Sequence, residues 1–210
     1  TDIRFISPNA FSYGSSDGIR LNIEALEILL KGIRGILGRD GRIFFGTFPS
    51  EVRPEHVRPE TLELIKRYCD NDNIVIGAQS GSERVLKALR RGHAVEDVKR
   101  AVRLCKDYGI KVNVDFIFGL PEETEKDQMD TVKLMQEVVE YGARVHAHYF
   151  MPLPGTPLQD AMASPLSDKL LQAIKGLLPT GRLFGQWAKQ REFTEKLLKR
   201  RSQYVSETAD

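Results

Sequence analysis

Five strand-like runs alternate with helical patterns through the first three quarters of the chain, and this alternation constrains the fold more than any other feature. The strand-like runs are 3–7, 42–48, 73–79, 112–119 and 145–152. Apolar residues at helical spacing fill the intervals at 22–38, 58–69, 82–91, 95–109 and 123–142. Because strands separated by helices are joined by right-handed crossovers, the pattern predicts an α/β fold with a parallel sheet or barrel.

The number of strands decides which kind of barrel the chain can form. Residues 1–160 hold five strand and helix units, fewer than the eight of a closed TIM barrel. We therefore expect a partial (βα) barrel or an open sheet. After Pro165 only helical patterns follow, at 166–178 and 186–205, so residues 161–210 are expected to form a C-terminal helical extension.

The third run passes through a polar turn directly into a helix. Its β-branched residues at 74–76 indicate a strand buried on both faces. In the turn, Ser80 or Ser82 suits a helix N-cap, and Glu83, three residues after Ser80, would complete a capping box. A ligand contact through Gln79, Ser80 and Ser82 is the alternative, because α/β folds bind ligands where parallel strands end and helices begin. The turn by itself leaves both interpretations open.

Polar, glycine and proline residues recur at the carboxyl ends of all five runs. They are Ser7, Pro8 and Asn9; Thr47, Pro49 and Glu51; Gln79, Ser80 and Ser82; Gly119, Leu120 and Pro121; and Met151, Pro152 and the turn Leu-Pro-Gly-Thr-Pro. Since the carboxyl ends of parallel strands meet at one end of a barrel, we expect the functional residues to collect there.

The end of the fourth run carries both acidic residues and a glycine. Glu123, Glu125 and Asp127 lie at a helix start, where carboxylates favour the helix dipole, and helix electrostatics is their favoured interpretation. Gly119 lacks a side chain, which lets the backbone lie close to a flat ligand.

Two histidines, His146 and His148, alternate along the fifth run and therefore face the same way. That spacing suits a metal ion. No third ligand is apparent in the sequence, so polar packing inside the barrel is the favoured interpretation.

Charge and cysteine content exclude several classes of protein. The formal net charge of +2 over 210 residues gives no case for nucleic acid binding by itself. From Ala161 onward, however, nine Lys and Arg stand against five Asp and Glu. Cys69 and Cys105 lie far apart in helical patterns, which indicates buried residues of a reducing compartment. No transmembrane or signal-peptide pattern is present, so we expect a cytoplasmic protein.

Four segments carry a resemblance to a known family. They are SPNAFSYG from Ser7, AQSGSERVLKALRRGH from Ala78, FIFGLPEETEKD from Phe116 and MPLPGTPL from Met151. In this order they resemble the second-, fourth-, fifth- and sixth-strand motifs of the radical S-adenosylmethionine (radical SAM) superfamily, in its methylthiotransferase and cobalamin-associated branch. The resemblance covers residues 3–158 and implies a partial barrel of the radical SAM type.

One departure from the family pattern is large. The Cys-x-x-x-Cys-x-x-Cys loop, whose thiolates hold a [4Fe-4S] cluster, is absent, and Cys69 and Cys105 do not supply three converging ligands. In the family that loop follows the first strand. The resemblance therefore implies a fragment that lacks the first strand, has its cluster ligands outside the chain and is inactive alone. Glu122, where the family has Gly, is a smaller departure in the turn beside the adenine site.

The resemblance also implies which residues contact S-adenosylmethionine. The implied contacts are Ser7, Pro8 and Asn9 for the methionine amino group; Gln79, Ser80 and Ser82 for the ribose or the methionyl end; and Phe118, Gly119, Leu120, Phe150 and Met151 for an apolar adenine slot. Arg91 is a candidate for the methionyl carboxylate, because guanidinium binds carboxylate through paired hydrogen bonds. A solvated helix end is the alternative for Arg91.

In the implied reaction, the reduced cluster donates an electron that cleaves S-adenosylmethionine, and the 5′-deoxyadenosyl radical abstracts a hydrogen from the substrate. Methylthiolation and cobalamin-linked methyl transfer are the reactions of this branch, so cobalamin is a candidate cofactor. A reductant protein of the flavodoxin or ferredoxin type is the expected partner, with no membrane. The substrate is a small molecule or a macromolecule. For the basic run at 186–204, a solvated face is favoured over a contact with an anionic partner, and nucleic acid stays open as a partner.

Two other functions fit the residues without a cluster. A cluster-free TIM-like barrel enzyme would hold a phosphorylated metabolite at the Gly119 and Gly155 turns, but no catalytic Lys or carboxylate pair stands at the strand ends. A non-catalytic RNA-binding scaffold would use the basic C-terminal part and bind with strong salt dependence. Its weakness is that the charge is confined to one helix.

Overall fold

Every strand pairing in the described part of the computed structural model is parallel, as the alternation of strands and helices predicts. The structure describes residues 1–207, with side chains as far as residue 200. In chain order the elements are β1 (Asp2–Arg4), η1 (Ala10–Ser12), α1 (Ile23–Leu37), β2 (Arg42–Phe44), η2 (Pro54–His56), α2 (Pro59–Tyr68), β3 (Asn73–Gln79), α3 (Glu83–Ala88), α4 (Val95–Asp107), β4 (Lys111–Phe118), α5 (Glu125–Glu140), β5 (Arg144–Tyr149), α6 (Asp168–Leu177), β6 (Leu183–Phe184) and α7 (Trp187–Glu207).

Two groups of strands form one continuous surface. β1 pairs with β2, and β3, β4, β5 and β6 pair in that order. The segment after β2 joins the groups, because the Val75 N–H donates to Gly46 O at 2.9 Å and the Val52 N–H donates to Val75 O at 2.8 Å. The result is the expected partial barrel.

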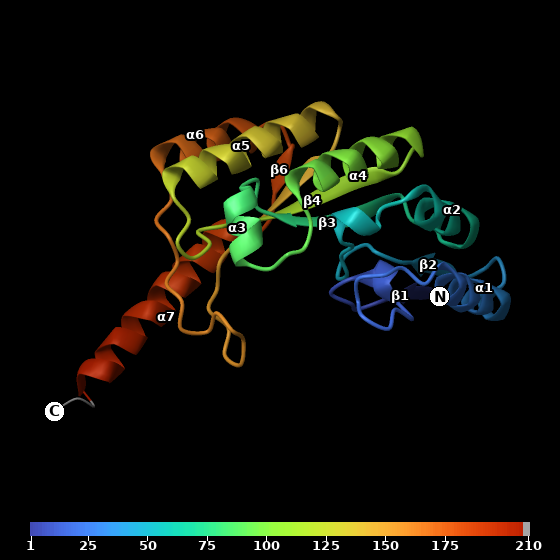
Figure 1. The fold of residues 1–210 in the computed structure, drawn as a ribbon, viewed down its shortest axis with the longest axis horizontal. Coiled ribbons are helices and arrows are strands. Elements are labelled where there is room, and N and C mark those ends of the chain that lie inside the picture. Colours follow the sequence, from blue (N-terminus) through green and yellow to red (C-terminus); the bar gives the residue numbers. More distant parts are fainter. Residues whose placement is uncertain (208–210) are drawn as a thin grey trace.

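The two faces of the sheet differ in character. β4 and β5 alternate between buried and half-buried residues, with apolar side chains such as Val114 and Val145 on the buried face. Helices α4, α5 and α6 cover that face side by side (Figure 1). The opposite, inner face carries Asp115, His146 and His148, which are half-buried. β3 is buried on both faces, as its apolar run predicts.

The polar turn after β3 is a helix cap with a different arrangement from the predicted capping box. Ser82 caps α3, accepting from the Val85 N–H. Ser80 is not the cap, because its hydroxyl accepts from the Ser82 N–H at 3.1 Å. The Glu83 carboxylate accepts from the Val95 N–H at 2.7 Å instead of closing a box. It thereby connects α3 to the start of α4.

The C-terminal part is not made of helices alone, which corrects the sequence-based expectation. β6 adds two residues to the free edge of β5, with Val145 opposite Leu183. α7 then packs against the sheet, where the Trp187 ring meets Phe118 edge to face at 6.0 Å between centroids. Its far end projects away from the body (Figure 1). None of the described helices, α7 included, is both long and apolar enough to cross a membrane.

Candidate functional site

A cavity of about 910 Å³ lies at the carboxyl ends of β3, β4 and β5, where the sequence predicts the functional residues. Its volume falls within the range of about 300–1,000 Å³ common for small-molecule sites. Its polar side chains are Glu51, Gln79, Arg90, Arg91, Asp115, His148, Tyr149, Thr156 and Gln190. Its apolar side chains include Leu89, Ile117, Leu120, Phe150, Met151 and Leu158.

The polar corner of the cavity is built from Glu51, Gln79 and Arg91. Gln79 Nε2 donates to Glu51 Oε2 at 3.2 Å, and Arg91 Nη2 lies 3.6 Å from Glu51 Oε1. Burial raises the pKa of Glu51 above its ordinary value, and the facing guanidinium of Arg91 offsets only part of this shift. Arg91 Nε is buried and has no hydrogen-bond partner among the described residues. The corner therefore holds a guanidinium with an unused donor.

Backbone geometry brings this corner together. Gln79 adopts φ 67°, a left-handed conformation that is costly for a residue with a side chain. A Cβ on Gly77 would lie 2.7 Å from Glu51 Oε2 and from Gln79 Nε2. A side chain at position 77 would therefore displace the Glu51 carboxylate and the Gln79 amide from their present positions.

The apolar wall comes from the segments that follow β4 and β5. Leu120 and Phe150 form a buried cluster with Val85, and the half-buried Ile117 and Leu158 pack against it. Of these side chains, Ile117, Leu120, Phe150 and Leu158 line the cavity. Ile117 lies directly opposite His148 in the β4–β5 pairing, so apolar and titratable side chains meet on this side of the cavity.

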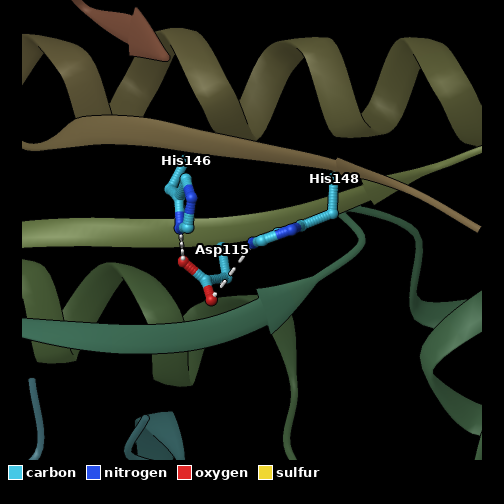
Figure 2. Close-up of side chains that lie close together, drawn as sticks. All are labelled: Asp115, His146 and His148. Carbon is cyan, nitrogen blue, oxygen red and sulfur yellow. Dashed lines mark hydrogen bonds and ion pairs between the residues drawn. The ribbon is translucent and has the colours of Figure 1, made fainter. Parts of the chain in front are cut away.

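Asp115, His146 and His148 converge on the inner face of the sheet (Figure 2). His146 Nδ1 lies 2.9 Å from Asp115 Oδ1, and His148 Nε2 lies 3.5 Å from Asp115 Oδ2. Burial alone would raise the pKa of Asp115, but the hydrogen bonds from the two histidines outweigh burial and hold the pKa below its ordinary value. Asp115 is thus the third candidate metal ligand beside the two histidines, and the sequence analysis did not identify it. The sequence did contain one indication. Asp115 is two residues from both Asn113 and Ile117 on β4, so it shares their half-buried face.

The acidic residues that precede and begin α5 do more than favour the helix dipole. Asp127 is buried, forms a capping box with Thr124 and pairs with Arg84 at 2.6 Å. Burial would raise the pKa of Asp127, yet the hydrogen bonds from Arg84, Ser82 and Thr124 hold it well below its usual range. Glu123 is the opposite case, because burial and the neighbouring Asp127 raise its pKa to about 7.

The Radical SAM superfamily profile matches residues 7–135, more than half of the chain. The chain belongs to the radical SAM superfamily. This agrees with the parallel partial barrel and with a cavity at the carboxyl ends of its strands. Members of the superfamily use S-adenosylmethionine and a [4Fe-4S] cluster.

Similar proteins support the same assignment. The tRNA-2-methylthio-N(6)-dimethylallyladenosine synthase of Sulfurihydrogenibium sp. is 30% identical over 84% of this chain and 39% of its own length. Coproporphyrinogen III oxidase from Escherichia coli, a radical SAM enzyme, superposes with a TM-score of 0.59 and is 22% identical. The superposition covers 80% of this chain and 39% of that enzyme. The radical SAM methyltransferase TsrM from Kitasatospora setae, solved with cobalamin and a [4Fe-4S] cluster, superposes with a TM-score of 0.52 and is 19% identical. The superposition covers 70% of this chain and 28% of TsrM. The chain spans well under half the length of these proteins.

The cavity of this radical SAM chain collects five of the predicted contact residues. These are Gln79, Arg91, Leu120, Phe150 and Met151. Phe118 instead points to the opposite face of β4, against Trp187. The space beside Gly119 is filled, since a Cβ there would lie 2.8 Å from the Tyr149 ring. Gly119 is thus needed for packing between β4 and β5.

The remaining predicted residues do not line the cavity. Ser80 is buried 3.2 Å from the Thr131 hydroxyl, and Ser82 donates to Asp127. Asn9 Nδ2 lies 2.9 Å from His56 Nδ1, while Ser7 O accepts from the Ser50 hydroxyl. None of these side chains, nor Pro8, lines the cavity.

The two cysteines do not fit the role of cluster ligands. Burial raises the pKa of both Cys69 and Cys105 to about 12, whereas cluster ligands are thiolates. Neither residue lines the cavity. Cys105 is buried and Cys69 is half-buried, which agrees with the sequence-based interpretation of structural cysteines.

Proposed function

We propose that this chain forms the S-adenosylmethionine-binding part of a radical SAM enzyme and that the cofactor occupies the cavity at the ends of β3, β4 and β5. The observation that carries the proposal is the buried, unpartnered Nε of Arg91 beside Glu51. A buried donor without a partner is costly, and an anionic ligand would satisfy it. S-adenosylmethionine has a carboxylate at one end and a flat adenine at the other, and the cavity offers both the guanidinium of Arg91 and the apolar side chains of Leu120, Phe150 and Met151.

Each part of the cofactor has candidate partners. Arg91 would hold the methionyl carboxylate, while Glu51 and Gln79 would accept from the amino group and the ribose hydroxyls. Leu120, Phe150 and Met151 would pack against adenine and exclude water. Ser7, Pro8, Asn9, Ser80, Ser82, Phe118 and Gly119 do not line the cavity and would act indirectly, by fixing the segments that carry these groups.

S-adenosylmethionine supplies a carbon radical that abstracts hydrogen when a reduced [4Fe-4S] cluster donates an electron to it. Because Cys69 and Cys105 do not suit a cluster, we infer that its thiolates come from residues outside these 210 and that the chain alone is inactive. The protein groups named here would bind and orient the cofactor. A reductant of the flavodoxin or ferredoxin type would supply the electron to the complete enzyme.

For the transferred group, we propose methylthiolation or cobalamin-linked methyl transfer. The 30% identity to an enzyme named as a tRNA methylthiolating synthase supports the first. Cobalamin is supported only by the shared fold of TsrM. Mass spectrometry of products from the complete enzyme separates the two, because methylthiolation adds a sulfur atom that methyl transfer does not.

Calorimetric titration of the 210-residue chain with S-adenosylmethionine tests the proposed cavity. Wild-type chain should bind one equivalent, and Arg91→Gln should weaken binding at least tenfold, since a hydrogen bond to a charged group contributes about 1.5–3 kcal/mol. Arg103→Gln is the matched control, because Arg103 lies on α4 outside the cavity. Circular dichroism checks that the variants fold.

Equal binding by wild type and Arg91→Gln would contradict the role of Arg91. If the folded wild-type chain does not bind S-adenosylmethionine, the cofactor site itself is wrong. Titration with inorganic phosphate would then test the cluster-free barrel enzyme. In the complete enzyme, anaerobic reconstitution and reduction should release 5′-deoxyadenosine.

A further inference from the structure

We propose that Asp115, His146 and His148 bind a divalent transition-metal ion on the inner face of the sheet, and that this ion takes an oxygen donor of the substrate as a further ligand. The three side chains come from the two central strands β4 and β5. The proposal rests on these residues alone and stands whether or not the cavity binds S-adenosylmethionine.

The register of the sheet brings the three side chains together. Asp115 lies directly opposite His146 in the β4–β5 pairing, and His148 follows two residues later on the same face. The His146 ring stacks on Phe184 of β6, at 4.6 Å between centroids and 12° between planes. Strands on both sides hold β4 and β5, so the backbone positions of all three residues are constrained.

The distances already approach those around a bound ion. The candidate ligand atoms all lie within 4.8 Å of one another, and the closest pair, His146 Nδ1 and Asp115 Oδ1, is 2.9 Å apart. Two ligand atoms that are each about 2.0–2.2 Å from one ion lie about 3–3.5 Å apart, depending on the coordination geometry. Side-chain rotation, without movement of the strands, would therefore let an ion replace the protons that the histidines and the carboxylate share.

The ligand types indicate which ions fit. Two imidazoles and one carboxylate suit Zn²⁺, Fe²⁺ or Co²⁺, whereas Mg²⁺ prefers oxygen ligands. Three protein ligands leave at least one coordination position for an exogenous ligand, as in catalytic zinc sites. Asp115 and His148 also line the cavity, so this position faces the space in which a substrate would lie. A carboxylate or phosphate oxygen of the substrate would fill it.

A hydrogen-bonded triad without a metal is the competing explanation, and metal binding to the 210-residue chain separates the two. After chelator dialysis, the chain should bind one equivalent of Zn²⁺ by calorimetry. With Co²⁺ it should develop visible absorption bands without the near-ultraviolet band of a thiolate ligand. Azide at millimolar concentration should shift these bands by occupying the open position.

Variants of the three proposed metal ligands are compared with a variant of two residues outside the site. His146→Gln, His148→Gln and Asp115→Asn should each weaken Co²⁺ binding at least tenfold while circular dichroism stays unchanged. The control Cys69→Ser/Cys105→Ser should bind Co²⁺ like the wild type, because both thiols lie outside the cluster of ligands. His146→Gln should keep its affinity for S-adenosylmethionine, since His146 does not line the cavity.

Several results would overturn the site. They are the absence of stoichiometric binding by the folded chain, wild-type Co²⁺ affinity in His148→Gln, or loss of binding in the cysteine variant. A Co²⁺ spectrum that does not respond to azide would overturn the role of the ion in holding a substrate oxygen. Because Arg91→Gln affects cofactor binding and His146→Gln affects metal binding, failure of one proposal is distinguishable from failure of the other.

Discussion

The guanidinium of Arg91 lies 3.6 Å from the Glu51 carboxylate, and its Nε remains buried without a partner in the described chain. The pair joins the loop after β2 to the segment after α3. Both side chains are partly exposed to the cavity, at 28% for Arg91 and 22% for Glu51. The pair is therefore available to a ligand and also ties together the two sides of the cavity.

The first prediction concerns the energy of this pair. In a double-mutant cycle of Glu51→Gln and Arg91→Gln, urea unfolding at pH 7 should give a coupling energy of about 0.5–1 kcal/mol, because partly exposed pairs at this distance are screened. The same cycle on Glu96 and Arg103, which are 3.8 Å apart and more exposed, should give a value near zero. Additivity at the Glu51 and Arg91 pair would show that the contact does not stabilise the fold.

The second prediction is a pH dependence of stability caused by Glu123. Its folded-state pKa is about 7 against an ordinary value of 4.5, so the folded chain binds the proton more tightly than the unfolded chain. The free energy of unfolding should therefore fall as pH rises from 4.5 to 7, with a contribution on the order of 3 kcal/mol from this group. Asp127 acts in the opposite sense and only in more acidic solution, because its pKa is lowered.

Urea unfolding between pH 4.5 and pH 8 measures the Glu123 contribution. Glu123→Gln should flatten the slope and make the chain at least as stable as the wild type at pH 8. Glu51, whose pKa is also raised, contributes in the same direction, so the difference between variant and wild type is the relevant quantity. Glu125→Gln, at the first residue of α5, is the matched control, and an equal effect of both variants would contradict the assignment.

The third prediction is that Glu122→Gly stabilises the chain. Glu122 adopts φ 59°, a left-handed conformation that costs a non-glycine residue about 1–2 kcal/mol. The greater chain entropy of glycine in the unfolded state offsets part of this gain, so the free energy of unfolding should rise by about 0.5–1 kcal/mol. The Arg84 contact is made to the Glu122 carbonyl and would persist. A loss of stability would show that the Glu122 side chain is needed.

The fourth prediction is that Gly119→Ala destabilises the chain by about 2 kcal/mol or more, because overpacking and a positive φ add. Gly119 has φ +71°, and the added Cβ would lie 2.8 Å from the Tyr149 ring and 3.1 Å from Ser164 O. Tyr149→Ala should cost less stability in the Gly119→Ala background than in the wild type, because the clash with the ring is then removed. An unchanged midpoint of thermal unfolding in Gly119→Ala would contradict the packing role.

Local pattern was sufficient for most of the secondary structure. The strand at 73–79 and the helices at 59–68 and 125–140 lie where the apolar spacing predicts them. The parallel sheet follows from their alternation, because a crossover helix requires it. β6 was missed because two residues show no periodicity, and this strand exists only because the edge of β5 was free to pair.

The carboxyl ends of the strands predicted where the cavity lies, while the cofactor contacts assigned to its lining residues stay predictions. Gln79 and Arg91 were predicted and line the cavity. Phe118 was placed in the adenine slot, although its odd spacing from Asp115 puts it on the helix-covered face of β4. Ser80 and Ser82 were expected to approach a ligand, but α5 covers them through Thr131 and Asp127.

The sequence by itself determines the spacing of apolar and polar residues along the chain. This spacing specifies the helices, the strands, their order and which residues of one strand share a face. Contacts between strands depend on register and on the path of each crossover, which are set only when the whole core packs. That is why the sequence predicts that His146 and His148 share a face of their strand, since they are two residues apart. Asp115 is 31 residues away from His146, and only the assembled sheet brings it beside them. The same reason separates Arg91, whose chemistry was apparent early, from Glu51, whose place beside it was decided by the tertiary structure.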